Sequence, residues 1–348
     1  MSGRELGMGV AGCGGAAADL CRAIDALPGC RLAAAFDPVT PLAEDLARPR
    51  RAAVRRSLAA LLADPAVDAV YVAVPHHLLA PIARQALESG RHVLAEKPMA
   101  LDLAELHALE KTAADRDLRL GVVFPLRTTG PVRAARELIA GGAIGEIRMV
   151  RIQTVIDKPA AYWESGLSGR VADGWRSRRA TAGGGVVLMN TLHQLDAVRR
   201  LTGLDVTRVS AEIATLTATA EVEDAAGAVL RLSGGALATL TAYAHSPGAA
   251  VQESIEIDGS SGRIDLPGAG VVRIRPGKPW GELPAGLWSS LEPPVLDGYA
   301  EVLAGFLRAV RDGTAPPIGP RDAAAALATV LSIYRSAETG RSVDLDPL

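Results

Sequence analysis

The chain has 348 residues, of which 49% are hydrophobic and 22% charged, and its net charge is −2. One compact core rarely supports this length, so we expect two domains. The balance of 37 basic and 39 acidic residues gives no electrostatic basis for binding nucleic acid or a membrane. We find no secretory signal at the N-terminus and no apolar run near the ~20 residues of a membrane span. Three cysteines without zinc or paired-disulfide spacing favour a reducing, cytoplasmic setting.

A glycine-rich turn follows the first predicted strand, residues 6–11. It leads into an apolar helical pattern and matches the GxGxxG/A dinucleotide fingerprint. Gly12 makes the tight turn, and Gly14 lets the backbone approach a pyrophosphate, which then binds the free N–H groups at the helix start. We therefore expect Gly12, Gly14, Gly15 and Ala16 to bind a dinucleotide cofactor.

Asp37 ends the second predicted strand, residues 31–36, near the separation of about 20 residues at which this fingerprint places a ribose-binding carboxylate. A carboxylate there repels a 2′-phosphate, so the sequence favours NAD over NADP. Asp37 could instead be only a turn residue before Pro38. Arg48, Arg50 and Arg51 follow and could fold back toward a phosphate.

Two further predicted strands end in polar residues. The strand at 67–74 runs into Pro75, His76 and His77, which we place in a loop near the cofactor because no metal-ligand spacing accompanies them. The strand at 92–95 runs into Glu96-Lys97-Pro98. Ligands of open α/β sheets bind at the carboxyl ends of strands, so Lys97 is expected to face a ligand. The alternation of strands and helices predicts a Rossmann-type doubly wound parallel sheet in residues 1–124.

The pattern changes after residue 124. Residues 146–157 read as a strand, and the segments 229–243 and 254–266 read as antiparallel hairpins around glycine-rich turns. Residues 125–348 are therefore expected to form a second, α+β domain with a largely antiparallel sheet. Two helical patterns, 299–311 and 321–337, are expected to pack back onto the first domain.

Residues 157–183 show little periodicity yet hold Tyr162, Trp163 and Trp175 together with several arginines. Long segments of this kind in a compact domain are usually functional or disordered, and the aromatic residues disfavour disorder. Aromatic faces and guanidinium groups suit a polyhydroxylated or anionic substrate, and simple packing between domains is the alternative.

These motifs, taken in order, resemble the Gfo/Idh/MocA oxidoreductase family over nearly the whole chain. The resemblance rests on the Gly12 turn, Asp37, the strand ending at Pro75, the run 90–98 and the glycines 183–185. It implies an NAD(P)-dependent dehydrogenase or reductase acting on a polyol, cyclitol or keto-sugar. It also implies a homodimer or homotetramer formed through the outer face of the second sheet.

The resemblance also assigns site residues. It places Lys97 beside the nicotinamide and the reacting hydroxyl, with Glu96 fixing the loop, and it places Arg127 near the substrate crevice. Arg127 could equally be a helix-flanking charge. Many relatives carry histidine where this chain has Leu79.

His193 lies on a helical pattern from Gly183 to about residue 201, where the resemblance implies a general acid/base. Relatives carry an aspartate four residues earlier, and this chain has Met189. By helical spacing Asn190 and Asp196 are candidate substitutes, although Asp196 better fits a structural role. Histidine exchanges protons near neutral pH without perturbation, so we expect His193 to be the acid/base and Lys97 to position the hydroxyl.

Two other functions fit the same motifs. A lyase or glycosidase could retain NAD and oxidise its substrate only transiently. A non-catalytic dinucleotide or sugar sensor would account for Met189 and Leu79 but not for Lys97 and His193. A methyltransferase-type nucleotide fold is disfavoured by the placement of Glu-Lys-Pro.

Overall fold

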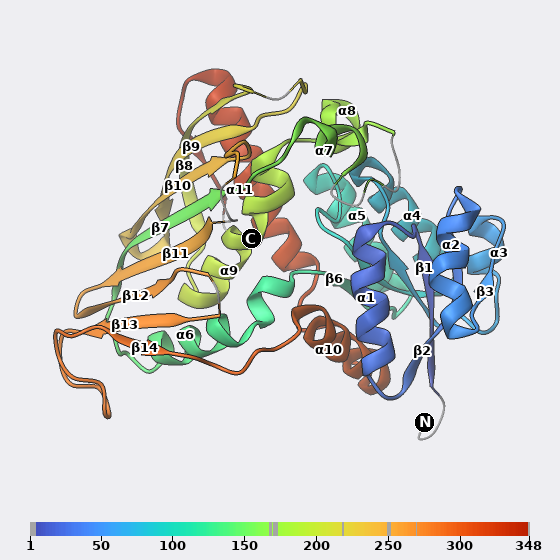
Figure 1. The fold of residues 1–348 in the computed structure, drawn as a ribbon, viewed down its shortest axis with the longest axis horizontal. Helices are drawn as coiled ribbons and strands as arrows, with labels where there is room; N and C mark the ends of the chain where they lie inside the picture. The colour runs from blue at the N-terminus through green and yellow to red at the C-terminus, as the bar shows by residue number, and fades with distance from the viewer. Residues whose placement is uncertain are drawn as a thin grey trace.

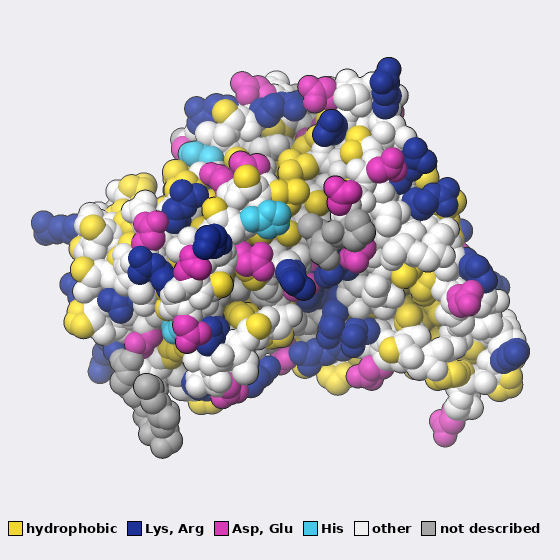
Figure 2. Space-filling view, turned by 180° about the vertical axis from the view of Figure 1, so that it is seen from behind, with side chains coloured by type: hydrophobic (Ala, Val, Ile, Leu, Met, Phe, Trp, Pro, Cys, Tyr) yellow, Lys and Arg dark blue, Asp and Glu magenta, His cyan; other side chains and the backbone are white. Residues whose placement is uncertain are grey.

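The computed structural model describes residues 5–166, 169, 173–217, 219–248, 252–268 and 270–346. The start of the N-terminus, on which the expectation of no secretory signal partly rests, and five residues of the 157–183 segment lie outside this range. Within the described range no helix combines the length and apolar composition that crossing a membrane needs. Lysine and arginine side chains are interspersed with aspartate and glutamate over the face in Figure 2.

The first half of the chain forms a six-stranded sheet in the order β3-β2-β1-β4-β5-β6 (Figure 1). All its strand pairs are parallel, which confirms the predicted doubly wound sheet. Its strands are β1 (Leu6–Ala11), β2 (Cys30–Phe36), β3 (Ala53–Val54), β4 (Ala69–Val72), β5 (His92–Ala95) and β6 (Leu120–Val122). The helices here are α1 (Gly15–Ala26), α2 (Thr40–Ala47), η1 (Arg48–Arg50), α3 (Leu58–Leu62), α4 (His76–Glu88), α5 (Leu103–Asp115) and η2 (Pro125–Thr128).

The second half forms a nine-stranded sheet in the order β14-β13-β12-β11-β7-β10-β9-β8-β15. Its neighbouring strands are antiparallel except for the parallel pair β7 and β10, so the expectation of a largely antiparallel sheet is confirmed. The strands are β7 (Ile147–Val155), β8 (Val206–Ala214), β9 (Ala225–Leu232), β10 (Leu237–Tyr243), β11 (Gln252–Gly259), β12 (Gly262–Leu266), β13 (Val272–Pro276), β14 (Ser289–Leu291) and β15 (Val343–Asp344).

Helices cover one face of the large sheet and reach the small one. They are α6 (Gly130–Ala140), α7 (Ala160–Ser165), η3 (Trp175–Ser177), α8 (Arg179–Ala182), η4 (Val187–Thr191), α9 (Leu192–Thr202), η5 (Ser233–Gly235), α10 (Gly298–Asp312) and α11 (Pro320–Thr339). The 157–183 segment thus contains short helices. Helix α10 packs against α1, and α11 packs against both α5 and β8 (Figure 1). The end of the chain therefore holds the two sheets together.

The segment after Gly183-Gly184-Gly185 is not one continuous α-helix. It begins with the π-helical turn η4 and continues as α9. The buried carboxylate of Glu223 accepts hydrogen bonds from the N–H groups of Gly185 (2.7 Å) and Val187 (3.0 Å), which have no partner within the helix. Tyr334 Oη donates to the same carboxylate at 3.0 Å. These bonds fix the start of the helix that carries Met189, Asn190 and His193.

Replacing Gly185 by alanine tests this arrangement, because a Cβ atom there would lie 1.8 Å from the Glu223 carbonyl oxygen. The helix start must move, and we expect G185A to lower the free energy of unfolding by about 1–3 kcal/mol in a denaturant titration. G227A is the matched control, since a Cβ at Gly227 meets nothing within 4 Å. Equal stability of the two variants would contradict the close approach.

Candidate functional site

Lys97 lies two residues after the end of β5, and its side chain connects the parallel sheet to the helical segment that follows the three glycines. Its Nζ donates a hydrogen bond to the Met189 carbonyl oxygen of η4 at 2.7 Å. The preceding Glu96 is buried and accepts a hydrogen bond from Tyr71 Oη at 2.5 Å, which fixes the end of the strand. Burial lowers the pKa of Lys97, and the charges of Lys158 and Arg176 lower it further, against the opposing charge of Glu96. The lysine is therefore held in place and easier to deprotonate than a surface lysine.

His193 stands beside Lys97. Its ring packs edge-on against Phe124, with ring centroids 5.9 Å apart. Nδ1 is buried, and no described residue gives it a hydrogen-bond partner. Burial and the charge of Lys97 hold the pKa of His193 well below its usual value, so the imidazole is neutral near pH 7.

The two expected substitutes for the missing aspartate do not bond to His193. Asn190 Oδ1 instead accepts a hydrogen bond from Lys158 Nζ. Asp196 binds Arg127 through both of its oxygens. Asn190 does not orient the imidazole, because a π-helical turn alters the spacing before His193. Asp196 takes the structural role that we expected for it, since Arg127 engages its carboxylate.

Lys158 is a site residue that the sequence reasoning missed. Its side chain is 3% exposed and donates to Asn190 Oδ1, while its Nζ lies 4.2 Å from the centroid of the Tyr162 ring and 5.5 Å from that of Trp163. Burial lowers its pKa to about 7, with a further contribution from the charge of Arg176. The sequence feature that could have identified Lys158 is its position just after a strand and just before a pair of aromatic residues.

The expected aromatic residues divide into two groups. Tyr162 Oη lies 3.6 Å from Met189 Sδ, next to the backbone that Lys97 binds. Trp175 packs against His76 at a centroid distance of 4.6 Å, with the Arg176 guanidinium on its ring. Trp163 is buried, 2% exposed, and contacts Tyr162 edge-on. It therefore acts on the site through Tyr162.

The expected cofactor residues line the carboxyl edge of the parallel sheet. Gly12 has φ +88°, and a Cβ there would lie 2.4 Å from the Ala73 carbonyl oxygen, so only glycine fits. By contrast, nothing lies within 4 Å of a Cβ on Gly14, which leaves the start of α1 open to a ligand. Asp37, after β2, accepts hydrogen bonds from the N–H groups of Cys13 (2.7 Å) and Val39 (2.8 Å). The glycine turn, the open start of α1 and the fixed carboxylate of Asp37 together fit a dinucleotide.

The next strand adds two more of the expected residues. The expectation of a loop at His76 and His77 is wrong, because both residues form the first turn of α4, and Pro75 precedes them as the N-cap residue. His76 Nδ1 lies 2.7 Å from the Ala182 carbonyl oxygen, so this edge of the small sheet contacts the large-sheet half. Leu79 is fully buried in α4, which makes it a packing residue.

Arg127 does not line the site with Lys97. Its side chain is buried and pairs with Asp196, Nε to Oδ2 at 2.8 Å, and its Nη2 lies 3.0 Å from Asp322 on α11. The expectation of substrate contact is not met, because both carboxylates hold the guanidinium between α9 and α11. It links the helices that carry the site.

Comparison with known proteins identifies the family. Residues 6–124 match the model of the oxidoreductase family with an NAD-binding Rossmann fold, and residues 132–265 match the GFO/IDH/MocA C-terminal domain. The chain belongs to the GFO/IDH/MocA family. This confirms the resemblance drawn from the Glu-Lys-Pro and glycine motifs, and with it an NAD(P)-dependent oxidoreductase.

Individual GFO/IDH/MocA members support the same conclusion. The chain is 29% identical over 306 residues to 1,5-anhydro-D-fructose reductase of Ensifer adhaerens, covering 83% of each chain. It is 26% identical over 295 residues to myo-inositol 2-dehydrogenase of Thermotoga maritima, covering 82% of each. The WlbA dehydrogenase of Bordetella pertussis, solved with NADH and UDP-GlcNAcA, superposes with a TM-score of 0.85 at 26% identity over 99% of this chain and 100% of that one.

Replacing Arg127 by methionine separates a structural from a substrate role. The change leaves Asp196 buried without its cation, so we expect R127M to lose about 3–5 kcal/mol of stability. The double variant R127M/D196L also removes the unpaired charge of Asp196. It should recover a large part of the lost free energy of unfolding in the same measurement. A raised KM with unchanged unfolding would instead support substrate contact.

Proposed function

We propose that this protein is an NAD-dependent dehydrogenase or ketoreductase that moves hydride between nicotinamide and the carbinol or carbonyl carbon of a sugar-like or cyclitol substrate. The main observation that supports this proposal is the proximity of Lys97 and His193, at the place where the dinucleotide-binding edge of the parallel sheet meets the second domain. The names of the relatives, a reductase of an anhydro-sugar and an inositol dehydrogenase, support this substrate class.

The cofactor binds along the edge of the parallel sheet. The N–H groups at the start of α1, from Gly14 to Ala16, hold the pyrophosphate, and Gly12 makes the turn that exposes them. Two backbone N–H groups fix the carboxylate of Asp37, whose remaining lone pairs accept the ribose hydroxyls and disfavour a 2′-phosphate. Pro75, His76, Glu96 and Lys97 border the nicotinamide, which supplies the hydride acceptor or donor when bound.

The proton moves between the substrate oxygen and His193. In the direction of oxidation, the O–H proton of the substrate would pass to the imidazole, while a bound nicotinamide would accept the hydride from the carbon that bears this oxygen. The lowered pKa of His193 keeps it neutral and able to accept. The Lys97 ammonium donates a hydrogen bond to the same oxygen and stabilises its developing negative charge. Reduction follows the reverse path.

A second group of residues holds the substrate. Lys158 brings a second ammonium to the site, and its bond to Asn190 fixes both side chains. Tyr162 and Trp175 offer aromatic faces for the apolar side of a sugar ring, with Trp163 behind Tyr162. Tyr162 and Lys158 both act electrostatically on Lys97, so this group borders the same site.

We also propose that the chain divides into a cofactor-binding domain, residues 1–124, and a substrate-binding and oligomerisation domain, residues 125–348. Exposed Val229 and Leu237 on the outer face of the large sheet support a homodimer or homotetramer. The three cysteines are buried, and none of them forms a disulfide bond among the described residues, which supports a reducing, cytoplasmic location.

Lys97→Ala provides the main test. We expect kcat with the best polyol or keto-sugar to fall at least ~100-fold, because K97A removes the group that stabilises charge on the oxygen. The dissociation constant for NADH, measured by fluorescence, should change less than about threefold. A wild-type protein that neither binds NAD(H) or NADP(H) nor changes nicotinamide absorbance with any compound of a polyol and keto-sugar panel would overturn the proposed function. Product release without net NADH would instead select the lyase alternative.

The titration of Lys158 makes a second test. Its pKa is about 7, so the wild-type ammonium loses its proton as the pH rises through neutrality. The substrate KM should therefore rise between pH 6 and pH 8. K158R keeps its charge and should hold a low KM, whereas K158M should hold a high KM throughout. If the KM of either variant rose in the same way between pH 6 and pH 8, the pH dependence would belong to a group other than Lys158.

A further inference from the structure

A second cavity lies beside the proposed reaction site, between helices α6 and α9, the inner edge of the large sheet and the segment 293–296. Its volume is about 260 Å³, which exceeds the ~150 Å³ of an apolar cavity able to hold benzene. Its walls are largely apolar, formed in part by Leu126, Val132, Ile255, Leu266, Val271 and Leu296. It is large enough for a substituent of a substrate.

Gln194 lines this cavity and is unsatisfied. Its side chain is 1% exposed, and neither Nε2 nor Oε1 has a hydrogen-bond partner among the described residues. Buried amides are almost always paired, so a ligand or water must complete this one. The amide offers the two N–H donors of Nε2 and the acceptor Oε1.

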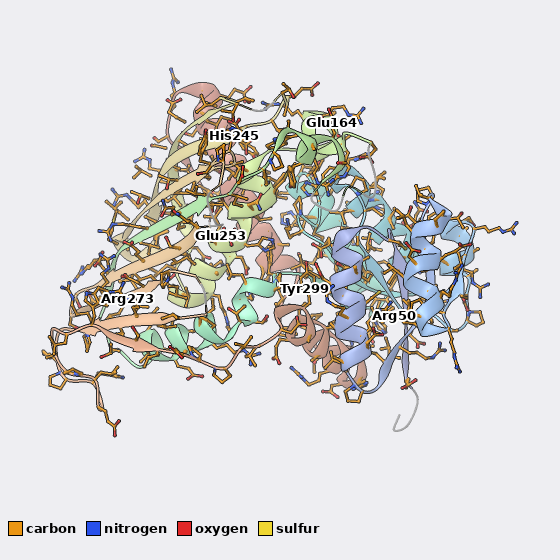
Figure 3. The ribbon with its side chains drawn as sticks, in the orientation of Figure 1. Arg50, Glu164, His245, Glu253, Arg273 and Tyr299 are labelled. Atoms are coloured by element: carbon orange, nitrogen blue, oxygen red, sulfur yellow. The ribbon has the colours of Figure 1, made fainter. Side chains whose placement is uncertain are left out.

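Glu253 supplies the charge of the cavity. It is the one ionisable side chain among the described lining residues. It lies opposite Thr154, whose buried hydroxyl bonds to Thr191, so Glu253 faces the covered side of the sheet (Figure 3). No described lysine or arginine pairs with its carboxylate at ion-pair distance, although its charge raises the pKa of Lys158.

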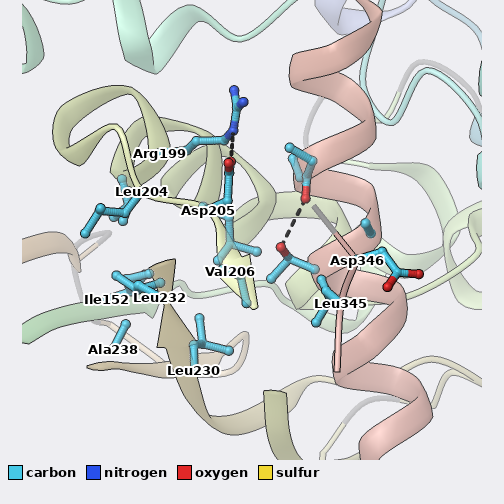
Figure 4. A pocket seen from close by; sticks show the side chains of 16 residues that line it. Ile152, Arg199, Leu204, Asp205, Val206, Leu230, Leu232, Ala238, Leu345 and Asp346 are labelled. Atoms are coloured by element: carbon cyan, nitrogen blue, oxygen red, sulfur yellow. Dashed lines mark hydrogen bonds and ion pairs between the residues drawn. The ribbon is translucent and has the colours of Figure 1, made fainter. Parts of the chain in front are cut away.

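The cavity adjoins the proposed reaction site through several elements. Gln194 follows His193 on α9, and Leu126 lies two residues beyond Phe124, which contacts the His193 ring. The cavity in Figure 4 differs, because its volume is about 40 Å³ and its Arg199 and Asp205 bind each other at 2.6 Å. The larger cavity is therefore the candidate for a subsite.

We propose that this cavity binds a protonated amino substituent of the substrate. The proposal rests on the proposed function, because it concerns the same substrate. The ammonium pairs with Glu253 and donates to Gln194 Oε1, while the apolar walls contact the neighbouring carbons. A carboxylate or phosphate would be repelled by Glu253, and a hydroxyl or acylamino group lacks the charge that this carboxylate complements.

Binding of matched sugars tests the subsite. Isothermal titration calorimetry at pH 6.5 compares D-glucose with its 2-, 3-, 4- and 6-amino analogues on the full-length, NAD-treated protein. We expect at least one amino isomer to bind at least ~10-fold more tightly than both glucose and its own N-acetyl derivative. E253Q should reduce this preference to about twofold or less.

E256Q is the control, since Glu256 lies on the same strand and pairs with Arg151 and Arg263 away from the cavity. The amine preference should survive in E256Q. Its persistence in E253Q, or a series in which no amino isomer binds more tightly than glucose, overturns the subsite. NAD binding and NADH formation, measured in parallel, report on the proposed function separately, because calorimetry detects an amine preference even without turnover.

Discussion

The hydrogen bond from Lys97 Nζ to the Met189 carbonyl oxygen joins the two halves of the site. Each end is held by its own buried carboxylate. Glu96, bonded to Tyr71, fixes the end of β5, and Glu223 holds the start of the helix that carries Met189. Because both ends are fixed, the position of the lysine relative to His193 follows from the packing of the two sheets.

The absence of a carboxylate at position 189 sets the electrostatics of the site. Lys97 and Lys158 lie close enough for the charge of one to lower the pKa of the other, and Arg176 adds to this effect. Burial keeps His193 neutral beside them. The charges of Glu223 and Glu253 act in the opposite direction and raise the pKa of Lys158.

Sequence reasoning located the strand ends that carry the expected cofactor residues, because these depend on local backbone geometry. The Gly12 turn, Asp37 and the Glu-Lys-Pro run lie at strand ends, and strand ends follow from the alternation of apolar and polar segments. It did not identify the bonding partners of Asn190 and Arg127, whereas Asp196 takes the structural role that we expected for it. Helical spacing assumes a regular helix, whereas η4 contains a π-helical turn, and no spacing rule identifies the partner of a buried arginine.

The sequence by itself determined the parallel sheet, the dinucleotide edge and the lysine at its end, because each depends on residues adjacent in the chain. Only the tertiary structure decided which side chains surround Lys97 and Lys158. Lys158 follows β7, Tyr162 lies on α7 and Glu253 lies on β11, and these segments come together through strand pairing and helix packing between residues far apart in sequence. Such contacts depend on the register and packing of whole elements, which no local pattern specifies.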